Sequence, residues 1–179
     1  QGRGGKGAKG GATRDEDFIE HIFIASTHDT MLFFSQMGKC FWLPVYQIPE
    51  GTRTSKGRAI QNMISLPPDD KIMAYIDIHD LEDEAFINEH YLVFCTKKGT
   101  IKKTTVEAFS RPRANGIVAI NIAEGDELLA VRLTNGNCEV MMAVKSGRAI
   151  RFPEEKVRPM GRTATGVIGI ELADDQDEV

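Results

Sequence analysis

Lys97-Lys98-Gly99-Thr100 is a glycine turn between two β-like runs, and the chain contains three turns of this kind. The other two read Gln36-Met37-Gly38-Lys39 and Lys145-Ser146-Gly147-Arg148. In each unit, 17 or 19 residues beyond the turn glycine, an arginine-bearing loop closes on a second glycine. These loops are Arg53-Thr54-Ser55-Lys56-Gly57, Arg111-Pro112-Arg113-Ala114-Asn115-Gly116 and Arg162-Thr163-Ala164-Thr165-Gly166. A repeat of about fifty residues predicts a modular architecture in which each unit packs against its neighbours.

Short runs rich in β-branched and aromatic residues flank the turns and loops. Their lengths suit strands and are too short for typical helices. We expect strands at 18–26, 30–35, 39–46, 91–96, 101–109, 117–122, 127–133, 139–144, 148–157 and 167–172. Ile168, Ile170 and Leu172 share one face of the last run, and this period of two is typical of an antiparallel sheet covered on one side. The segment 80–86 fits either one short helix or a solvated acidic linker.

The fold class that follows is all-β, with four-stranded antiparallel units that stack radially as the blades of a propeller. We divide the chain into a glycine-rich basic arm at 1–16, a first blade with an acidic linker at 17–89, a second blade at 90–136 and a third, truncated blade at 137–179. The third unit stops at the point where the second opens its fourth strand. Since natural domains avoid an open sheet edge, we expect these three blades to belong to a longer array.

The formal net charge of −4 conceals a strong segregation of charge along the chain. Residues 69–89 carry eight acids and one lysine, and residues 171–178 carry five acids and no base, so the rest of the chain has a net charge of +8. A polyanion responds to the field within about 8–10 Å, the Debye length near physiological salt, and not to the total charge. A basic face with acidic linkers is therefore compatible with DNA binding.

The sequence argues against several other classes of function. It has no apolar run long enough to span a membrane, and it lacks the glycine and lysine spacing of a nucleotide-binding P-loop. The four histidines lack the spacing of metal ligands, so we expect no metal site and no catalytic residues. Cys40, Cys95 and Cys138 form no C-x-x-C pair, and we expect them to be reduced core residues of a cytosolic protein.

The N-terminal residues and several stretches of the repeats together resemble the C-terminal domain of the DNA gyrase A subunit. Gln1-Gly2-Arg3-Gly4-Gly5-Lys6-Gly7 is similar to the gyrase box, whose usual form is Gln-Arg-Arg-Gly-Gly-Lys-Gly, but glycine replaces an arginine at position 2. The stretches that resemble the first blade are Thr27-His28-Asp29-Thr30 and Val45-Tyr46-Gln47-Ile48-Pro49. Those that resemble the third are Glu139-Val140-Met141-Met142, Phe152, Val157-Arg158-Pro159-Met160-Gly161 and Thr165-Gly166-Val167. The resemblance covers essentially the whole chain.

This resemblance implies a β-pinwheel, a propeller-like ring in which blades exchange strands with their neighbours. The ring normally has six blades, and three are present here. The resemblance also implies that double-stranded DNA wraps around a basic outer rim, which enables ATP-dependent negative supercoiling by the whole enzyme. The active site of that type II topoisomerase lies in other domains, so we expect this fragment to be non-catalytic and to hold no cofactor, while the whole enzyme needs ATP and Mg²⁺. The implied partners are the rest of the gyrase A subunit, together with the gyrase B subunit, in the bacterial cytoplasm at the nucleoid and away from any membrane.

Two alternative interpretations stay open. The C-terminal domain of the topoisomerase IV A subunit has similar blades but typically lacks the box. A propeller-like platform for protein interactions would share the fold without any role in nucleic-acid binding. The basic strands and the box-like N-terminus favour the DNA-wrapping interpretation over both.

The candidate DNA-binding residues are the cations that recur after each turn and in each loop, together with two from the box. They are Arg3, Lys6, Lys39, Arg53, Lys56, Arg58, Lys102, Lys103, Arg111, Arg113, Arg148, Arg151, Arg158 and Arg162. Stacking the units around an axis turns these clusters into a band along which a duplex can bend. Contacts to phosphates without base reading predict weak sequence preference and steep salt dependence.

Overall fold

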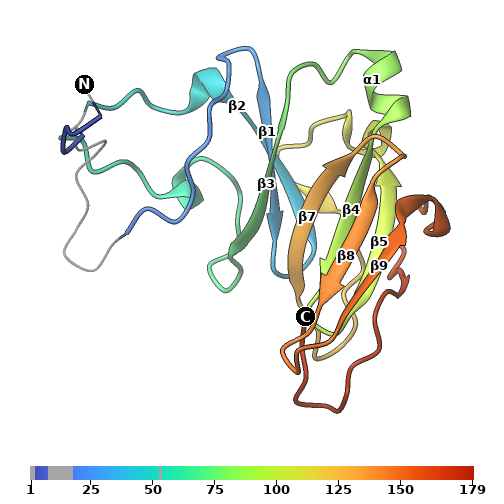
Figure 1. The fold of residues 1–179 in the computed structure, drawn as a ribbon. Coiled ribbons are helices and arrows are strands. Elements are labelled where there is room, and N and C mark those ends of the chain that lie inside the picture. Colours follow the sequence, from blue (N-terminus) through green and yellow to red (C-terminus); the bar gives the residue numbers. More distant parts are fainter. Residues whose placement is uncertain (1–2, 8–17, 53) are drawn as a thin grey trace.

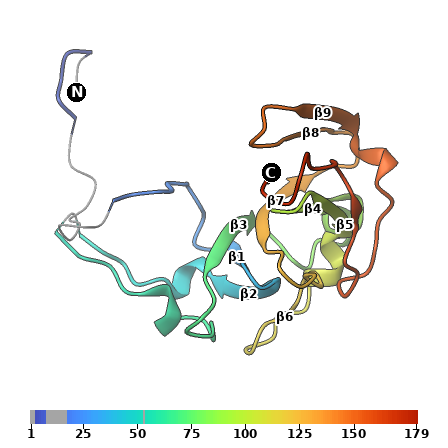
Figure 2. The same ribbon diagram turned by 90° about the horizontal axis from the view of Figure 1, so that it is seen from below.

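Each turn glycine of the repeat joins two antiparallel strands in the computed structural model, which describes residues 3–7, 18–52 and 54–179. The first sheet has the order β3-β1-β2-β6, with β1 at Thr30–Ser35, β2 at Lys39–Pro44, β3 at Ile72–Ile78 and β6 at Ile117–Val118. The second has the order β10-β5-β4-β7, with β4 at Tyr91–Thr96, β5 at Thr100–Thr105, β7 at Leu128–Thr134 and β10 at Val167–Ile168. The third pairs β8 (Glu139–Ala143) with β9 (Ala149–Pro153). The three sheets follow one another in chain order (Figures 1 and 2), as expected for successive blades of an all-β propeller.

Helical structure in the described residues is confined to short segments. The 3-10 turns are η1 (Val45–Gln47), η2 (Ile60–Asn62), η3 (Val106–Phe109) and η4 (Glu154–Lys156), and the one α-helix among the described residues is α1 (Glu84–Glu89). Of these, η1, η3 and η4 lie at matching points directly after β2, β5 and β9. The Asp83 carboxylate caps α1 by accepting a hydrogen bond from the backbone N–H of Phe86 at 3.1 Å. Of the two alternatives for the segment 80–86, a short helix or an acidic linker, the short helix forms, but at Glu84–Glu89. No helix in the described part of the chain is long and apolar enough to cross a membrane.

Neighbouring units exchange their short strands. By sequence, β6 follows the loop of the second unit, yet it pairs with β2 of the first sheet, where Val118 lies opposite Lys39. In the same way, β10 follows the loop of the third unit and pairs with β5 of the second sheet, where Ile168 lies opposite Thr100. This exchange confirms the pinwheel arrangement and links each unit to the preceding one through backbone hydrogen bonds.

The turn glycines lie where the exchanged segments cross. The Gly99 carbonyl accepts hydrogen bonds from the N–H groups of Gly169 and Ile170 at 2.9 and 3.3 Å. Gly99 has a φ of +88°, and a Cβ on it would lie 2.5 Å from the Ile170 carbonyl oxygen. Gly38, also at +88°, has the same relation to the Ile120 carbonyl oxygen. Glycine is therefore required there both by the backbone conformation and by the closeness of the next unit.

An aspartate braces each of these turns, a feature that our sequence analysis missed. One carboxylate oxygen accepts hydrogen bonds from the N–H just before the turn glycine and from the N–H of the residue after the aspartate. The three sets are Asp70 with Met37 and Lys71, Asp126 with Lys98 and Glu127, and Asp177 with Ser146 and Glu178, at 2.8–3.2 Å. The signal for it was an aspartate about thirty residues beyond each turn glycine in the repeat.

Three apolar clusters hold the sheets together. The largest joins the first and second sheets, where the Phe34 ring packs edge-on against Phe94 and Phe109 at centroid distances of 5.4 and 5.8 Å. A second cluster covers the outer face of the first sheet. A third joins the second sheet to the β8–β9 hairpin through residues such as Ile101 and Met142. Cys40 is buried and Cys95 and Cys138 are half-buried, and all three are free thiols.

The structure corrects two predictions about the first unit. The run 18–26 forms no strand, and Phe18, Ile22 and Ile24 are 80%, 90% and 97% exposed. An apolar run of this kind becomes a strand only when another strand pairs with it, and none does so in the described part of the chain. Conversely, the alternating run Ile72–Ile78, which the sequence analysis placed in an acidic linker, is strand β3. In Figure 1 the segments 48–52 and 54–59 extend away from the sheets.

Replacing the turn glycines with alanine tests the crossing contact. Gly99→Ala combines a left-handed backbone conformation, which costs a non-glycine residue about 1–2 kcal/mol, with a clash at the Ile170 carbonyl that costs about 1–3 kcal/mol more. Gly147→Ala is the matched control because Gly147 has a φ of +90° but no heavy atom within 4 Å of the added Cβ. Urea unfolding should show that Gly99→Ala lowers the free energy of unfolding clearly more than Gly147→Ala does. Equal losses for the two variants would contradict the role of the crossing segment.

The Asp177 brace predicts acid sensitivity. Hydrogen bonds from the N–H of Ala173, and then from the hydroxyl and N–H of Ser146, lower the pKa of Asp177 from 3.8 to about 2. A carboxyl whose pKa is lowered on folding stabilises the fold above its unfolded pKa, and this contribution is lost as the pH falls from about 4 through 2. The stability gap between the wild type and Asp177→Asn, measured by urea unfolding, should therefore narrow over that range. Asp175→Asn, at an exposed neighbour, is the control; a gap that stays constant with pH argues against the brace.

Candidate nucleic-acid interface

The second and third arginine-bearing loops lie at corresponding points of their units, between a 3-10 turn and an exchanged strand. In the second and third units the chain runs from β5 through η3, or from β9 through η4, into the loop, and then into the exchanged strand. Because that strand pairs with the preceding sheet, each loop bridges the space between two neighbouring sheets. The exchange of strands therefore places the second and third loops at equivalent positions, each between two neighbouring sheets.

Most of the predicted DNA-binding residues are solvent-exposed. The exposed ones are Arg3, Lys6, Lys56, Arg58, Arg111, Arg113, Arg148, Arg151 and Arg158. Lys39 and Arg162 are half-buried. Arg53, and the box residues Gln1 and Gly2, lie outside the described residues, whereas Gly4, Gly5 and Gly7 of the box are exposed. We use the name loop arginines for Arg111 and Arg113 of the second loop, Arg162 of the third loop and Arg158, which lies four residues before the third loop.

The third loop rests on the exchanged segment of the second unit. The Arg162 guanidinium donates a hydrogen bond from Nη1 to the Val118 carbonyl at 3.3 Å. The N–H of Asn121 donates to the Ala164 carbonyl at 3.2 Å. The third loop is thus joined to β6 and to the residues that follow it, which come directly after the second loop in the sequence.

Several of the exposed cations have acidic neighbours. Arg111 lies 2.7 Å from Glu107, Arg151 lies 3.7 Å from Glu139, and Arg148 lies 3.8 Å from the otherwise buried Asp177. Exposed ion pairs contribute about 0–1 kcal/mol to stability. DNA phosphates can therefore replace these weak partners at little cost.

The structure contradicts the prediction that Lys102 and Lys103 contact DNA. Both are buried, with 0% and 4% of their surface exposed, so neither belongs to an exposed basic surface. Consecutive side chains of a strand point to opposite faces. Because β5 is an interior strand covered on both faces, one lysine is enclosed on each side.

Lys103 is held by the 3-10 turn of the third unit. Its ammonium donates to the Glu154 carbonyl at 2.9 Å, lies 3.9 Å from the Glu154 carboxylate and stands 4.9 Å from the centre of the Tyr91 ring. The carboxylate also accepts hydrogen bonds from the Thr134 hydroxyl and the N–H of Cys138. Trp42 occupies the same repeat position in β2, and its Nε1–H donates to the Phe109 carbonyl of η3 at 2.9 Å. This position therefore ties each unit to the 3-10 turn of the next.

With this geometry established, comparison with known proteins identifies the family. A family profile described as "DNA gyrase C-terminal domain, beta-propeller" matches residues 1–26, 29–74, 90–135 and 139–179. The chain belongs to this gyrase C-terminal domain family. The DNA gyrase A subunit of Salmonella typhimurium is 45% identical over 179 residues, which are 100% of this chain and 20% of that protein. The gyrase A subunit of Halalkalibacterium halodurans is 48% identical over 170 residues, or 95% of this chain and 20% of that protein.

Solved structures agree with this assignment. The C-terminal domain of DNA topoisomerase IV matches with a TM-score of 0.75 at 30% identity, covering 85% of this chain and 46% of that one. A DNA gyrase A C-terminal domain matches with a TM-score of 0.67 at 23% identity, covering 86% and 47%. The gyrase-type pinwheel is thus shared with topoisomerase IV, and the chain spans about a fifth of the length of the curated relatives that it matches.

A ladder of polar side chains crosses the three units of this gyrase-type domain at their turns. Gln36 of the first unit contacts Glu127, which also accepts from the Lys97 ammonium at 3.0 Å. Lys97 lies 3.2 Å from Glu178, and Glu178 lies 3.6 Å from Lys145 of the third unit. Hydrogen bonds that its ammonium donates to Glu127 and then to Glu178 raise the pKa of Lys97, so it stays charged at neutral pH. The ladder fixes the turns of adjacent units against one another.

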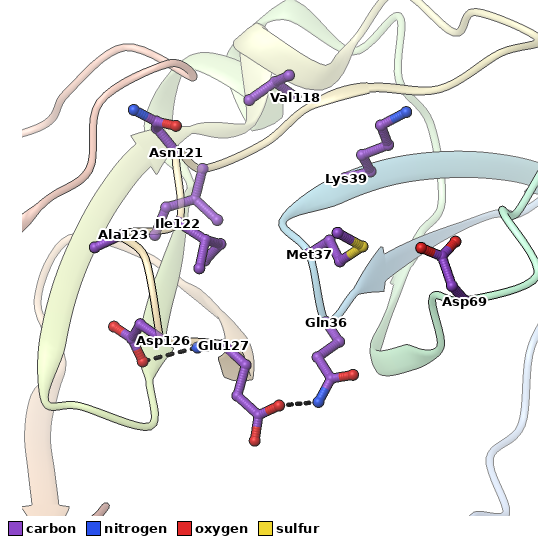
Figure 3. A pocket seen from close by; sticks show the side chains of 11 residues that line it. Gln36, Met37, Lys39, Asp69, Val118, Asn121, Ile122, Ala123, Asp126 and Glu127 are labelled. Carbon is purple, nitrogen blue, oxygen red and sulfur yellow. Dashed lines mark hydrogen bonds between the residues drawn. The ribbon is translucent and has the colours of Figure 1, made fainter.

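A cavity of about 530 Å³ lies beside the first step of this ladder, between the turn of the first unit and the segment after β6. Figure 3 shows Gln36, Met37 and Lys39 on one side, and Ile122 and Glu127 on the other. Asp69 and Asp126 line it as well. In the described part of the chain no group of three or more histidine, cysteine or acidic side chains is placed to hold a metal ion.

Removing Glu154 tests the buried pair. Glu154→Ala leaves the Lys103 ammonium buried without its countercharge and should cost about 3–5 kcal/mol in the free energy of unfolding. Glu107→Ala, which removes the partner of the 84% exposed Arg111, should cost about 0–1 kcal/mol. Urea unfolding of both variants measures the difference, and similar losses would refute the structural role of the pair.

Proposed function

We propose that this chain is a non-catalytic module of DNA gyrase that binds duplex DNA and bends it around the edge carrying the loop arginines. The observation that supports this most directly is the hydrogen bond from Arg162 of the third loop to Val118 of β6, the exchanged strand that follows the second loop. Strand exchange lines up the cations of successive units, and a duplex that follows the edge meets one cluster after another. The membership of the gyrase C-terminal domain family supports the same role.

Wrapping is energetically reasonable for such a surface. Bending a site of 20–30 base pairs by 40–90° costs on the order of 1–6 kcal/mol. Each phosphate neutralised by an arginine or lysine releases condensed counterions, and several such contacts offset the bending cost. Histones bend DNA in the same manner, with arginines that contact the backbone and no base-specific contacts.

Within the whole enzyme, the proposed task is to present a wrapped DNA segment for ATP-dependent negative supercoiling. The strand-passing chemistry, with its ATP and Mg²⁺, then belongs to the rest of the gyrase A subunit, together with the gyrase B subunit, in the bacterial cytoplasm at the nucleoid. The likeness to topoisomerase IV makes that enzyme the second candidate. The box-like residues Arg3-Gly4-Gly5-Lys6-Gly7 and the 45–48% identity to gyrase relatives favour gyrase.

Titration of labelled duplex DNA at several salt concentrations tests the binding surface. We expect Arg111→Ala combined with Arg158→Ala to weaken binding at least tenfold at low salt and to reduce the slope of log K against log [salt] by about 1.8, or 0.9 for each lost phosphate contact. The control combines Lys71→Ala and Lys145→Ala, which remove two exposed cations outside the loops, and should change affinity less than twofold.

Equal losses of DNA affinity in the two double variants would refute the proposal that DNA binds at the loops. Binding without salt dependence, or no binding even at low salt, would refute DNA wrapping as a whole and favour the protein-interaction alternative. A change in plasmid linking number, measured after a nicked plasmid is sealed in the presence of the chain, reports wrapping directly.

A further inference from the structure

The Lys102 ammonium lies enclosed where three units meet. Lys102 belongs to β5 of the second sheet and is fully buried. Its Nζ donates to the carbonyl of Ala119, in the segment that follows the exchanged strand β6, at 2.5 Å. It also donates to the carbonyl of Arg162, in the third loop, at 2.5 Å. One side chain therefore fastens a loop arginine of the third unit to a segment that is paired with the first sheet.

Lys102 differs from the neighbouring Lys103 in having no countercharge. No ion pair involves Lys102 in the part of the chain that the structure describes, whereas Lys103 lies beside Glu154. The Phe94 ring stands 5.3 Å from Nζ and supplies only a weak cation–π attraction. The charge that acts on the ammonium is the like charge of Arg162. Burial and then the Arg162 guanidinium lower the pKa of Lys102 from 10.5 to about 7.

A phosphate at Arg162 would change the equilibrium between the neutral and charged forms of Lys102. An arginine guanidinium carries a permanent positive charge, so the repulsion between the Arg162 side chain and the Lys102 ammonium persists until an anion binds nearby. Phosphate oxygens near the loop would favour the ammonium form of Lys102, and hydrogen bonds from an ammonium are roughly twice as strong as those from a neutral donor. Binding of DNA and protonation of Lys102 thus reinforce each other.

We propose that Lys102 is a positioning residue of the DNA interface, which in its ammonium form fixes the Arg162 loop on the exchanged segment, and that engagement of this loop by DNA is coupled to uptake of a proton by Lys102. This inference rests on the proposed DNA-wrapping function. Lys102 touches no DNA itself and acts through the main chain of Arg162. Its expected consequence is that affinity for DNA falls as the pH rises above about 7.

Other groups that titrate in this range lie elsewhere. Burial and then the neighbouring Asp29 raise the pKa of Asp77 to about 6. The hydrogen bond to Asp29 raises the pKa of His79. Both lie in or beside β3 of the first sheet, and neither influences Lys102. Comparing the wild type with variants at Lys102 removes their contribution.

The test measures the affinity of the full chain for a labelled duplex between pH 6.5 and 9.0 at constant ionic strength. If DNA raises the pKa of Lys102 by one unit, the wild type loses about tenfold in affinity across this range. Lys102→Met cannot carry a charge, so it should bind about tenfold more weakly at pH 6.5 and lack this part of the pH dependence. Lys102→Arg stays charged throughout and should bind at pH 9.0 about as tightly as the wild type does at pH 6.5. Circular dichroism establishes that each variant is folded, and either variant alone decides the question if the other fails to fold.

A second measurement needs no DNA. The N–H of Asn121 donates to the Ala164 carbonyl, so its hydrogen-exchange protection factor reports whether the third loop is seated. We expect this protection to fall in Lys102→Met, and in the wild type as the pH rises above about 7, but not in Lys102→Arg. The amide of Leu92, within β4 and away from the loop, is the internal control.

The results of these experiments distinguish failure of the Lys102 proposal from failure of the proposed DNA-wrapping function. Matching pH profiles of DNA affinity for the wild type and both variants would overturn the role of Lys102 while leaving DNA binding intact. Absence of DNA binding at every pH would refute the proposed function, and the Asn121 protection then decides whether Lys102 still positions the loop. Unchanged protection in all variants would overturn that positioning role as well.

Discussion

The rest of the structure depends on the contact between a turn glycine and the segment that crosses it from the next unit. The Gly38 and Gly99 carbonyls each accept two backbone N–H groups from that segment, and any side chain at these positions would collide with it. These hydrogen bonds, with the short pairings of β6 and β10, join units that would otherwise be separate sheets. They also decide where each arginine loop runs, because the loop lies between the 3-10 turn of its own unit and the strand given to the preceding one. The position of the cations is therefore a consequence of backbone topology.

The sequence predicted what local chemistry determines and failed where burial depends on neighbours. Glycine turns are local signals, and the three sheets form around them as expected. The alternating runs 117–122 and 167–172 were predicted as longer strands than they are, since they pair only over 117–118 and 167–168. Lys102 and Lys103 were misplaced because a charged residue in a strand is normally exposed, whereas strand β5 is enclosed on both faces by elements distant in sequence. The run 18–26 failed for the opposite reason, since it has strand composition but no strand beside it in the described structure. The alternating pattern of β3 was present in the sequence, but we assigned the segment to a linker because of the acidic residues around it.

The two buried lysines of β5 differ in whether a negative charge lies beside their ammonium group. Lys103 is stabilised by the Glu154 carboxylate, which the Thr134 hydroxyl and the Cys138 N–H hold in place, and this satisfied pair acts as a fixed joint between the second and third units. Trp42 makes the equivalent joint between the first and second units with a neutral donor, so the joint does not need a charge. Lys102 has only carbonyl oxygens and an aromatic ring around it, so its charge is not compensated locally. An uncompensated charge next to a proposed phosphate-binding arginine is sensitive to an anion in a way that the Lys103 pair is not.

The same topology explains how an acidic chain presents a basic edge. Many of the acids serve at the turns, where Asp70, Asp126 and Asp177 bind backbone N–H groups and Glu127 and Glu178 pair with lysines. The loops lie at the ends of the exchanged strands, and within the described residues Arg113 and Arg158 form no ion pair there. The carboxylates at the turns thus bind backbone N–H groups and lysines, while these two arginines on or beside the loops stay unpaired within the described residues. Because screening limits the reach of a charge to about 8–10 Å, a duplex at the loops is influenced mainly by these cations and little by the net charge of −4.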